Sequence, residues 1–168
     1  AQVAAYLAAG LEVAGTVALP DGATASDAAI ALEAGRLNLP EAVAYVDVAG
    51  VAQNNRELAA QFALAAAEMG QGLVIEGRSL NSGLNDAQAL GVPVGEIFRN
   101  LAGAQQDARV LERFLAQAAF QARQDNAVVL VGELNAETID AVNNFLDTPR
   151  GKQVALAPLS AVLALQSN

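Results

Sequence analysis

Charged and amide side chains lie at the ends of the strands that the sequence predicts. Asp21 follows the first strand, Asp47 lies near the end of the second, and the others stand at later strand ends: Glu76, Arg78, Arg99, Asn100 and Glu133. Parallel α/β folds gather their functional groups at the carboxyl ends of the strands. Three carboxylates gathered there could hold a hard cation through oxygen or act as an acid–base pair. The alternative is that these residues are polar because loops face water.

Two chemically versatile residue types are absent from the sequence. The chain has no histidine and no cysteine. Thiol nucleophiles, zinc–thiolate centres, disulfides and Ser-His-Asp triads are therefore excluded. The stretch 91–95 is neither a Walker phosphate loop nor a GxGxxG fingerprint, and no GxSxG nucleophile elbow occurs.

The charge and hydropathy of the chain limit the classes of partner that we expect. Its 168 residues include 18 acidic and 9 basic side chains, which give a net charge of −9. Because nucleic-acid affinity comes mainly from lysine and arginine on phosphates, we expect no nucleic-acid partner. Hydrophobic residues make up 54% of the chain, but no apolar run reaches the roughly 20 residues that span a bilayer, so we expect no membrane insertion.

Helical and extended patterns alternate along the chain. The expected helices cover residues 2–9, 26–34, 53–69, 84–90, 105–124 and 136–146, with a short final helix capped by Ser160. Gly35 is expected to end the second of them. The expected strands cover residues 11–19, 42–48, 73–75, 92–98, 127–131 and 154–157. This alternation predicts an α/β fold, with a parallel sheet or barrel and helices outside, in a single domain of residues 1–168.

Five stretches resemble, in order, the motifs of one protein family. Residues 9–13 (AGLEV) with 18–20 (ALP) resemble its "Gly-His-Glu-Val … His-Leu-Pro" strand, and residues 72–79 (GLVIEGRS) resemble its "Gly-Leu-Leu-Phe-Leu-Asp-Ser-Arg-Thr" strand. Residues 90–100 (LGVPVGEIFRN) resemble its "Gly-Val-Pro … Asp-Val-Phe-Leu-Asp" segment. Residues 128–139 (VVLVGELNAETI) are similar to its "Ala-Ile-Ala-Ile-Gly-His-Pro … Glu-Thr-Leu", and residues 154–162 (VALAPLSAV) to its closing "Leu-Val-Pro-Leu-Ser". On these motifs the chain is identified as a member of the divergent polysaccharide deacetylases.

The resemblance implies a distorted (β/α) barrel and an exported, periplasmic or other envelope-facing location. The wider superfamily removes N-acetyl groups from amino sugars. It does so with a divalent metal held by an aspartate and two histidines, together with an aspartate base and a histidine acid. The metal lowers the pKa of its water and polarises the amide oxygen, which is why those ligands are needed.

The sequence departs from the family pattern at the metal-binding positions. Leu11 stands where the family has the histidine of "Gly-His-Glu", and Glu133 and Leu134 replace "His-Pro". The family's "Asn-Asn-His-Met-Gly" corresponds best to residues 46–50 (VDVAG), so this histidine is absent too. The family's leading segment, with its paired aspartates, has no counterpart here. We therefore expect a barrel without its first strands, completed by a longer parent chain or by a partner.

Four residues of the chain are polar at positions where the family has polar functional residues. Glu76 falls at a family aspartate, Arg78 at its arginine, Asn100 at a second aspartate, and Glu133 at a histidine. Together with Asp47 these residues are the predicted binding residues. No catalytic residue, metal ligand or cofactor is predicted with them.

Three hypotheses follow for the function of the chain. The first is a catalytically inactive deacetylase-like domain of carbohydrate and cell-envelope metabolism, which binds a saccharide or an envelope protein. The second is a hydrolase in which Asp47, Glu76 and Glu133 hold Mg²⁺, Mn²⁺ or Ca²⁺, or work as an acid–base pair. The third is a structural or assembly domain without a small ligand, since an incomplete barrel leaves sheet edges that recruit a partner chain.

Overall fold

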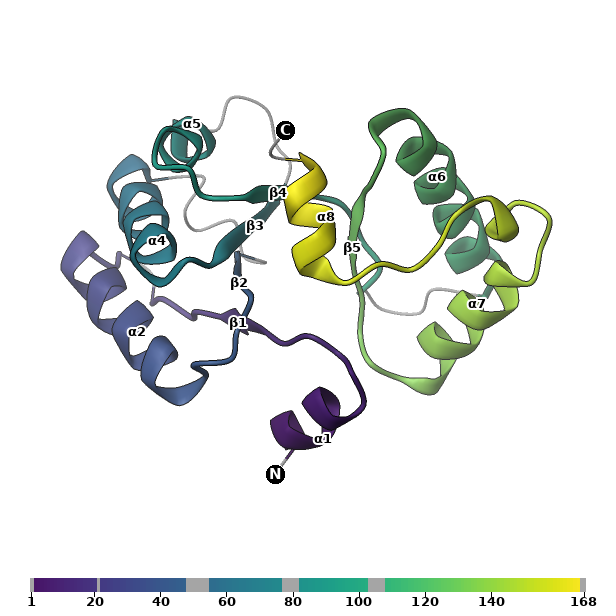
Figure 1. The fold of residues 1–168 in the computed structure, drawn as a ribbon, viewed down its shortest axis with the longest axis horizontal. Helices are drawn as coiled ribbons and strands as arrows, with labels where there is room; N and C mark the ends of the chain where they lie inside the picture. The colour runs from purple at the N-terminus through teal and green to yellow at the C-terminus, as the bar shows by residue number, and fades with distance from the viewer. Residues whose placement is uncertain (1, 21, 48–54, 77–81, 103–107, 167–168) are drawn as a thin grey trace. The chain divides into compact units, whose positions relative to one another are not determined.

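Parallel strands and helices alternate along the chain (Figure 1). The computed structural model describes all residues except 1, 21, 48–54, 77–81, 103–107 and 167–168. The strands are β1 (Ala14–Thr16), β2 (Ala44–Asp47), β3 (Gly72–Glu76), β4 (Val94–Asn100) and β5 (Val129–Val131). The sheet order is β1-β2-β3-β4-β5, and β1–β2, β2–β3 and β4–β5 pair in parallel. The predicted α/β class is confirmed, and the strand order fits the expected distorted (β/α) barrel.

The helices begin and end at residues whose side chains or backbone angles satisfy the helix termini. They are α1 (Gln2–Ala8), α2 (Ala25–Asn38), α4 (Arg56–Met69), α5 (Ser82–Ala89), α6 (Ala108–Asp125), α7 (Ala136–Leu146) and α8 (Leu159–Gln166), with a 3-10 helix η1 (Gly151–Gln153). Thr24 and Asp27 form a capping box at the start of α2, and Asn55 and Asn135 cap α4 and α7. Gly70 ends α4 in the left-handed conformation that glycine adopts without strain. Within the described residues, no helix combines the length and apolar character needed to cross a bilayer.

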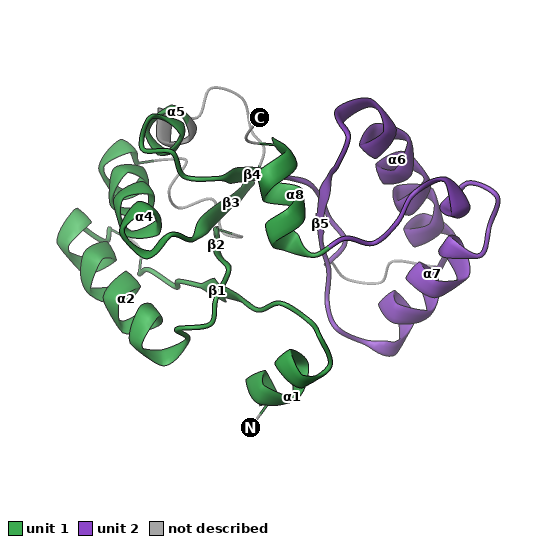
Figure 2. Ribbon diagram, in the orientation of Figure 1, with its two compact units in different colours: residues 1–96, 158–168 green, residues 97–157 purple. Residues whose placement is uncertain are grey.

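The chain divides into two compact units, which Figure 2 distinguishes by colour. Unit 1 comprises residues 1–96 and 158–168, and unit 2 comprises residues 97–157. Unit 1 therefore contains both ends of the chain, and unit 2 is a continuous segment between them.

The Tyr45 ring organises the core of unit 1. It is 2% exposed, and its hydroxyl donates to the Leu32 carbonyl oxygen on α2 at 3.4 Å. A Cβ at Gly15 would lie 3.1 Å from the ring, and one at Gly35 would lie 3.5 Å from it. The first distance is tight, so β1 approaches the ring closely because Gly15 lacks a side chain; the second is an ordinary contact between α2 and the ring. Alanines of α2 and α4 fill the space around it, which allows the helices to pack near the sheet.

Helix α2 is longer than the sequence predicts. Gly35 was expected to end it, but the helix continues to Asn38. The glycine lies against the Tyr45 ring inside the helix, and it has no positive φ angle. Because Gly35 keeps a helical backbone, it does not end the helix, and the prediction of the helix end was wrong.

The opposite face of the sheet in unit 1 is covered by α8. A Cβ at Gly72 of β3 would lie 2.5 Å from Leu163 Cδ1, so the leucine packs directly over the glycine. Figure 1 shows α8 on one side of β3, and α4 with α2 on the other. The strands β2 and β3 are thus covered on both faces, as expected for a parallel sheet.

Unit 2 packs α6 and α7 around a small apolar cluster. Its buried members are Leu101, Leu111, Leu115, Ala119 and Phe145. The stretch 154–157 was predicted as a strand, but it forms none, because the chain first turns through η1. Thr148 fixes this turn: its hydroxyl donates to the Phe145 carbonyl oxygen at 2.6 Å and accepts from the Gly151 N–H at 3.0 Å. Val154 then packs against the cluster instead of pairing in the sheet.

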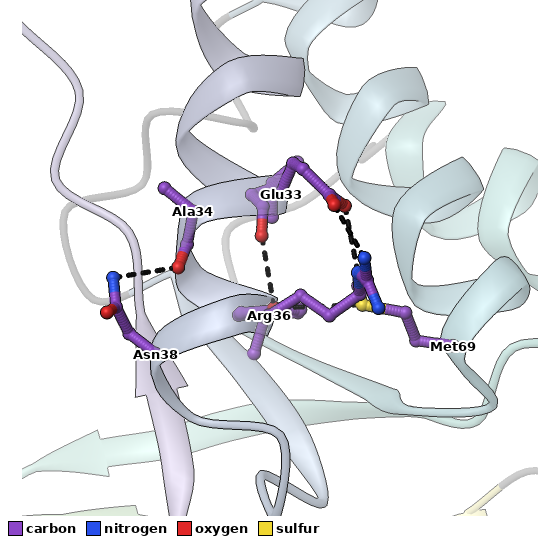
Figure 3. A network of polar contacts seen from close by, with 7 residues as sticks. Glu33, Ala34, Arg36, Asn38 and Met69 are labelled. Atoms are coloured by element: carbon purple, nitrogen blue, oxygen red, sulfur yellow. Dashed lines mark hydrogen bonds and ion pairs between the residues drawn. The ribbon is translucent and has the colours of Figure 1, made fainter.

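The burial of Tyr45 predicts a loss of stability at alkaline pH. Burial raises the pKa of its hydroxyl above the usual value, while the positive charge of Arg36 opposes this and the negative charge of Glu33 adds to it. Figure 3 shows Glu33 and Arg36 paired on α2, beside Met69 of α4. Below a pH of about 10 the Tyr45 hydroxyl is neutral in both the folded and the unfolded protein. Above that pH the hydroxyl ionises readily only in the unfolded protein, so the free energy of unfolding falls.

Tyr45→Phe should therefore lose less stability than the wild type between about pH 9 and pH 11.5 in urea denaturation. At pH 7 it should be less stable by about 0.5–1 kcal/mol, because a weak hydrogen bond is lost. Tyr6→Phe is the control for removal of a phenol. Parallel alkaline curves for Tyr45→Phe and the wild type would contradict this role for burial.

Candidate functional site

The residues predicted from the sequence to form a binding site lie at or just after the ends of strands. Asp47 is the last residue of β2, Glu76 the last of β3 and Asn100 the last of β4, and Glu133 follows β5 by two residues. Arg78 lies outside the described residues. The four described residues therefore stand at the carboxyl ends of parallel strands. Asp47 and Glu76 belong to unit 1, and Asn100 and Glu133 belong to unit 2.

In unit 1, strand register separates the two carboxylates. Asp47 is in register with Ile75, which belongs to the core cluster beneath the helices. Side chains alternate between the two faces along a strand. Asp47 therefore shares the helix-covered face with Tyr45 and Ile75, whereas Glu76, the next residue after Ile75, belongs to the opposite face. The two carboxylates come from neighbouring strands but face opposite sides of the sheet.

The surroundings of these two residues differ accordingly. Asp47 is buried, with 8% of its surface exposed, while Glu76 is half-buried. Both already interact with other residues of the chain. Burying a carboxylate without a partner would cost free energy, so a carboxylate at the buried position of Asp47 needs an interaction. Glu76 is the carboxylate of unit 1 that a ligand on the face opposite α2 and α4 could reach.

In unit 2, the strand-end residues stabilise their own turns. The Asn100 Oδ1 accepts from the Ala102 N–H at 2.8 Å, which forms an Asx turn at the end of β4. The Glu133 Oε2 accepts from the Asn135 Nδ2 at 3.4 Å, and Asn135 caps α7 through the Thr138 N–H. Both Asn100 and Glu133 are exposed. Asn100 thus keeps its side-chain amide for a ligand, and Glu133 keeps one carboxylate oxygen.

One contact between distant residues could not be predicted from the sequence. The Glu12 carboxylate accepts from the Ser160 N–H at 2.8 Å and from the Ser160 hydroxyl at 2.5 Å. Ser160 lies in the first turn of α8, where a negative charge complements the helix dipole. The contact joins the first and last family-like stretches across 148 positions of sequence. The spacing of neighbouring residues cannot predict a contact between Glu12 and Ser160, although both residues lie within the stretches that resemble family motifs.

The residues present do not fit the metal that the resemblance implies. That metal needs an aspartate and two histidines, and the sequence contains no histidine. Within the described part of the chain, no three acidic side chains gather in an arrangement that could hold a metal ion. Of the three carboxylates of the second hypothesis, Asp47 and Glu76 belong to unit 1 and face opposite sides of its sheet, and Glu133 belongs to unit 2.

The described residues line a hollow in each unit. The first, of about 520 Å³, lies between α2 and α4 and is lined by residues that include Glu33, Arg36 and Met69. It is at the amino ends of β2 and β3, because Pro40 and Gln71 also line it. The second, of about 770 Å³, lies in unit 2 beside α6 and is rich in arginine.

Comparison with known proteins gives one family match. A family model described as divergent polysaccharide deacetylase matches residues 9–163 of the chain. No curated protein matches the sequence. The matched range includes all five strands and reaches into α8.

The Glu12 contact leads to a prediction about α8. Glu12→Gln removes the charge and one acceptor, so we expect the free energy of unfolding to fall by about 1 kcal/mol. Amide hydrogen exchange in α8 should accelerate more than exchange in α6. The matched control is Glu41→Gln, which removes an exposed charge elsewhere in unit 1. Equal exchange in the two variants would show that the contact does not hold α8.

Proposed function

We propose that this chain, which belongs to the divergent polysaccharide deacetylase family, binds envelope carbohydrate or an envelope protein without catalysing deacetylation. The observation that carries the proposal is the absence of histidine from all 168 residues. We further propose that the protein works in an exported, periplasmic or other envelope-facing location, as the family resemblance implies.

The chemistry of deacetylation explains why histidine matters. Amide hydrolysis near neutral pH needs an activated water, a polarised carbonyl and a proton donor for the leaving amine. The Leu11 side chain, 56% exposed at a family histidine position, offers no lone pair and no proton. Glu133 can bind a hydroxyl or an amide, but it lacks the imidazole that would supply a proton near pH 7. We infer that the position supports binding and not catalysis.

The proposed contacts with saccharide are hydrogen bonds from strand-end side chains. Hydroxyl and acetamido groups of an amino sugar donate and accept, as carboxylate and amide side chains require. Exposure supports this role for Asn100 and Glu133, and the half-buried position supports it for Glu76. The set predicted from the sequence also includes Asp47, which is buried on the helix-covered face of β2, and Arg78, which lies outside the described residues.

A second candidate function is assembly with another chain. Within the described residues, β1 and β5 end the strand order, so each has one neighbouring strand. An unpaired strand edge can hydrogen-bond to a strand of another protein. The exposed Leu134, which follows β5, and the exposed Leu11, which precedes β1, add apolar surface near these edges. This candidate differs from the first because it needs no saccharide.

One set of measurements distinguishes saccharide binding, assembly with another chain and catalysis. We expect N-acetylglucosamine oligosaccharides to shift amide resonances of the chain in a saturable manner, without release of acetate. Calorimetry with Zn²⁺, Mn²⁺, Mg²⁺ and Ca²⁺ should show no stoichiometric binding. Glu76→Gln and Asn100→Ala should each weaken saccharide binding about threefold to tenfold, because each removes a hydrogen-bonding group.

Glu41→Gln is again the control, since it changes an exposed charge that the proposed contacts do not include. Acetate release that a divalent cation stimulates and Glu133→Gln abolishes would overturn the proposal in favour of catalysis. Absence of saccharide binding, with capture of a partner chain at β1 or β5, would replace it with the assembly candidate.

A further inference from the structure

Unit 2 contains a hollow lined by arginines from three parts of the chain. Its volume is about 770 Å³. The arginines are Arg99 at the end of β4, Arg113 and Arg123 on α6, and Arg150 before η1. The other described residues that line it are Phe98, Ala116, Gln117, Ala119, Phe120, Gln121 and Gln153, so none of the described lining residues is acidic.

This concentration of arginine contrasts with the charge of the chain as a whole. The net charge is −9, yet four of the nine basic residues line this one hollow. Within the described residues the ion pairs join Arg36 to Glu33 and Arg56 to Asp86, both in unit 1. The four arginines of the hollow are paired with no described carboxylate. Four unpaired like charges repel one another, and an anion between them would relieve that repulsion.

Arg99 supplies a second, independent observation. Its Nε is buried and has no hydrogen-bond partner in the described part of the chain. Its guanidinium carbon lies 4.3 Å from the centre of the Phe114 ring, a cation–π distance that holds the group in place. The register shift between Ile97 and Arg99 marks a bulge in β4, a feature that re-aims side chains. A buried donor without an acceptor is unfavourable. Because the Nε atom is covered by protein, a ligand in the hollow would contact the part of Arg99 that lines it.

The face of α6 that lines the hollow carries an exposed aromatic side chain as well as arginine. Arg113, Gln117 and Phe120 follow at intervals of four and three residues, so they share one face of the helix. Phe120 is 62% exposed on this face, although the opposite face of α6 packs on α7. Arg123 Nη1 donates to the Gln153 Oε1, which ties the end of α6 to η1 beside Arg150.

We propose that this hollow binds a small organic anion that carries at least two oxyanion charges, from carboxylate or phosphate groups, next to an apolar or aromatic ring. The guanidinium groups bind the oxyanions through paired N–H donors, which match carboxylate and phosphate geometry. Phe98 and Phe120 contact the ring of the ligand, and the three glutamines of the lining bind its neutral polar groups. The inference is independent of the strand-end contacts and of the proposed function.

Binding is tested by nuclear magnetic resonance titration of the full chain at low salt. The probes are inorganic phosphate, phenyl phosphate, tripolyphosphate and citrate. We expect saturable shifts in α6 and η1, with phenyl phosphate binding more tightly than inorganic phosphate. Comparison of citrate with tripolyphosphate identifies whether carboxylate or phosphate is preferred. Absence of saturable binding below about 5 mM for every probe would overturn the proposal.

Two double variants separate a specific site from general attraction by positive charge. Arg113→Gln with Arg150→Gln removes two exposed charges of the hollow, and Arg36→Gln with Arg56→Gln removes two from unit 1. We expect the first pair to weaken binding about tenfold or more and the second to change it by less than about twofold. Equal weakening by both pairs would overturn the proposal.

A single variant tests the aromatic contact. Phe120→Ala should weaken phenyl phosphate by about threefold to tenfold while leaving inorganic phosphate unchanged, because only the first has a ring to pack on the side chain. Phe120 is exposed, so the variant is expected to fold, and its thermal unfolding provides the check. Equal binding of phenyl phosphate by the variant and the wild type would remove the aromatic part of the proposal.

Discussion

The close approach of backbone to the Tyr45 ring sets the geometry of unit 1. A Cβ at Gly15 on β1 would lie only 3.1 Å from the ring, so the missing side chain lets β1 approach it closely, whereas one at Gly35 on α2 would lie at the ordinary contact distance of 3.5 Å. Tyr45 is the largest of the fully buried side chains among the described residues. The ring therefore fixes how near α2 lies to the sheet, and its contact with Leu32 and Met69 also involves α4.

The same tyrosine determines which strand-end groups a ligand can reach. It occupies the helix-covered face of β2, so Asp47, two residues later, must occupy that face as well. Glu76 takes the other face, where α8 packs near the opposite end of β3 at Gly72. The Glu12 contact with Ser160 then joins the chain before β1 to α8. Contacts of this kind stabilise a fold whose sequence contains no histidine.

Charge is distributed unevenly along the chain. The saccharide contacts proposed for the strand-end side chains involve neutral groups, which suits a chain whose net charge of −9 repels anions at long range. The hollow in unit 2 departs from this average, since arginines from β4, α6 and the start of η1 meet there without carboxylates. Local clustering of charge outweighs net charge within about a Debye length, roughly 8–10 Å. One chain can thus carry sites of opposite electrostatic character.

The sequence by itself determined the alternation of strands and helices and the positions of polar residues at strand ends, because periodicity and capping act within a few residues. It failed at Gly35 and at residues 154–157, where the Tyr45 ring and the Thr148 turn override local preference. Only the tertiary structure decided that Asp47 and Glu76 face opposite sides, that Glu12 holds Ser160, and that arginines surround one hollow. These features depend on strand register and on contacts between distant residues, which no local pattern encodes.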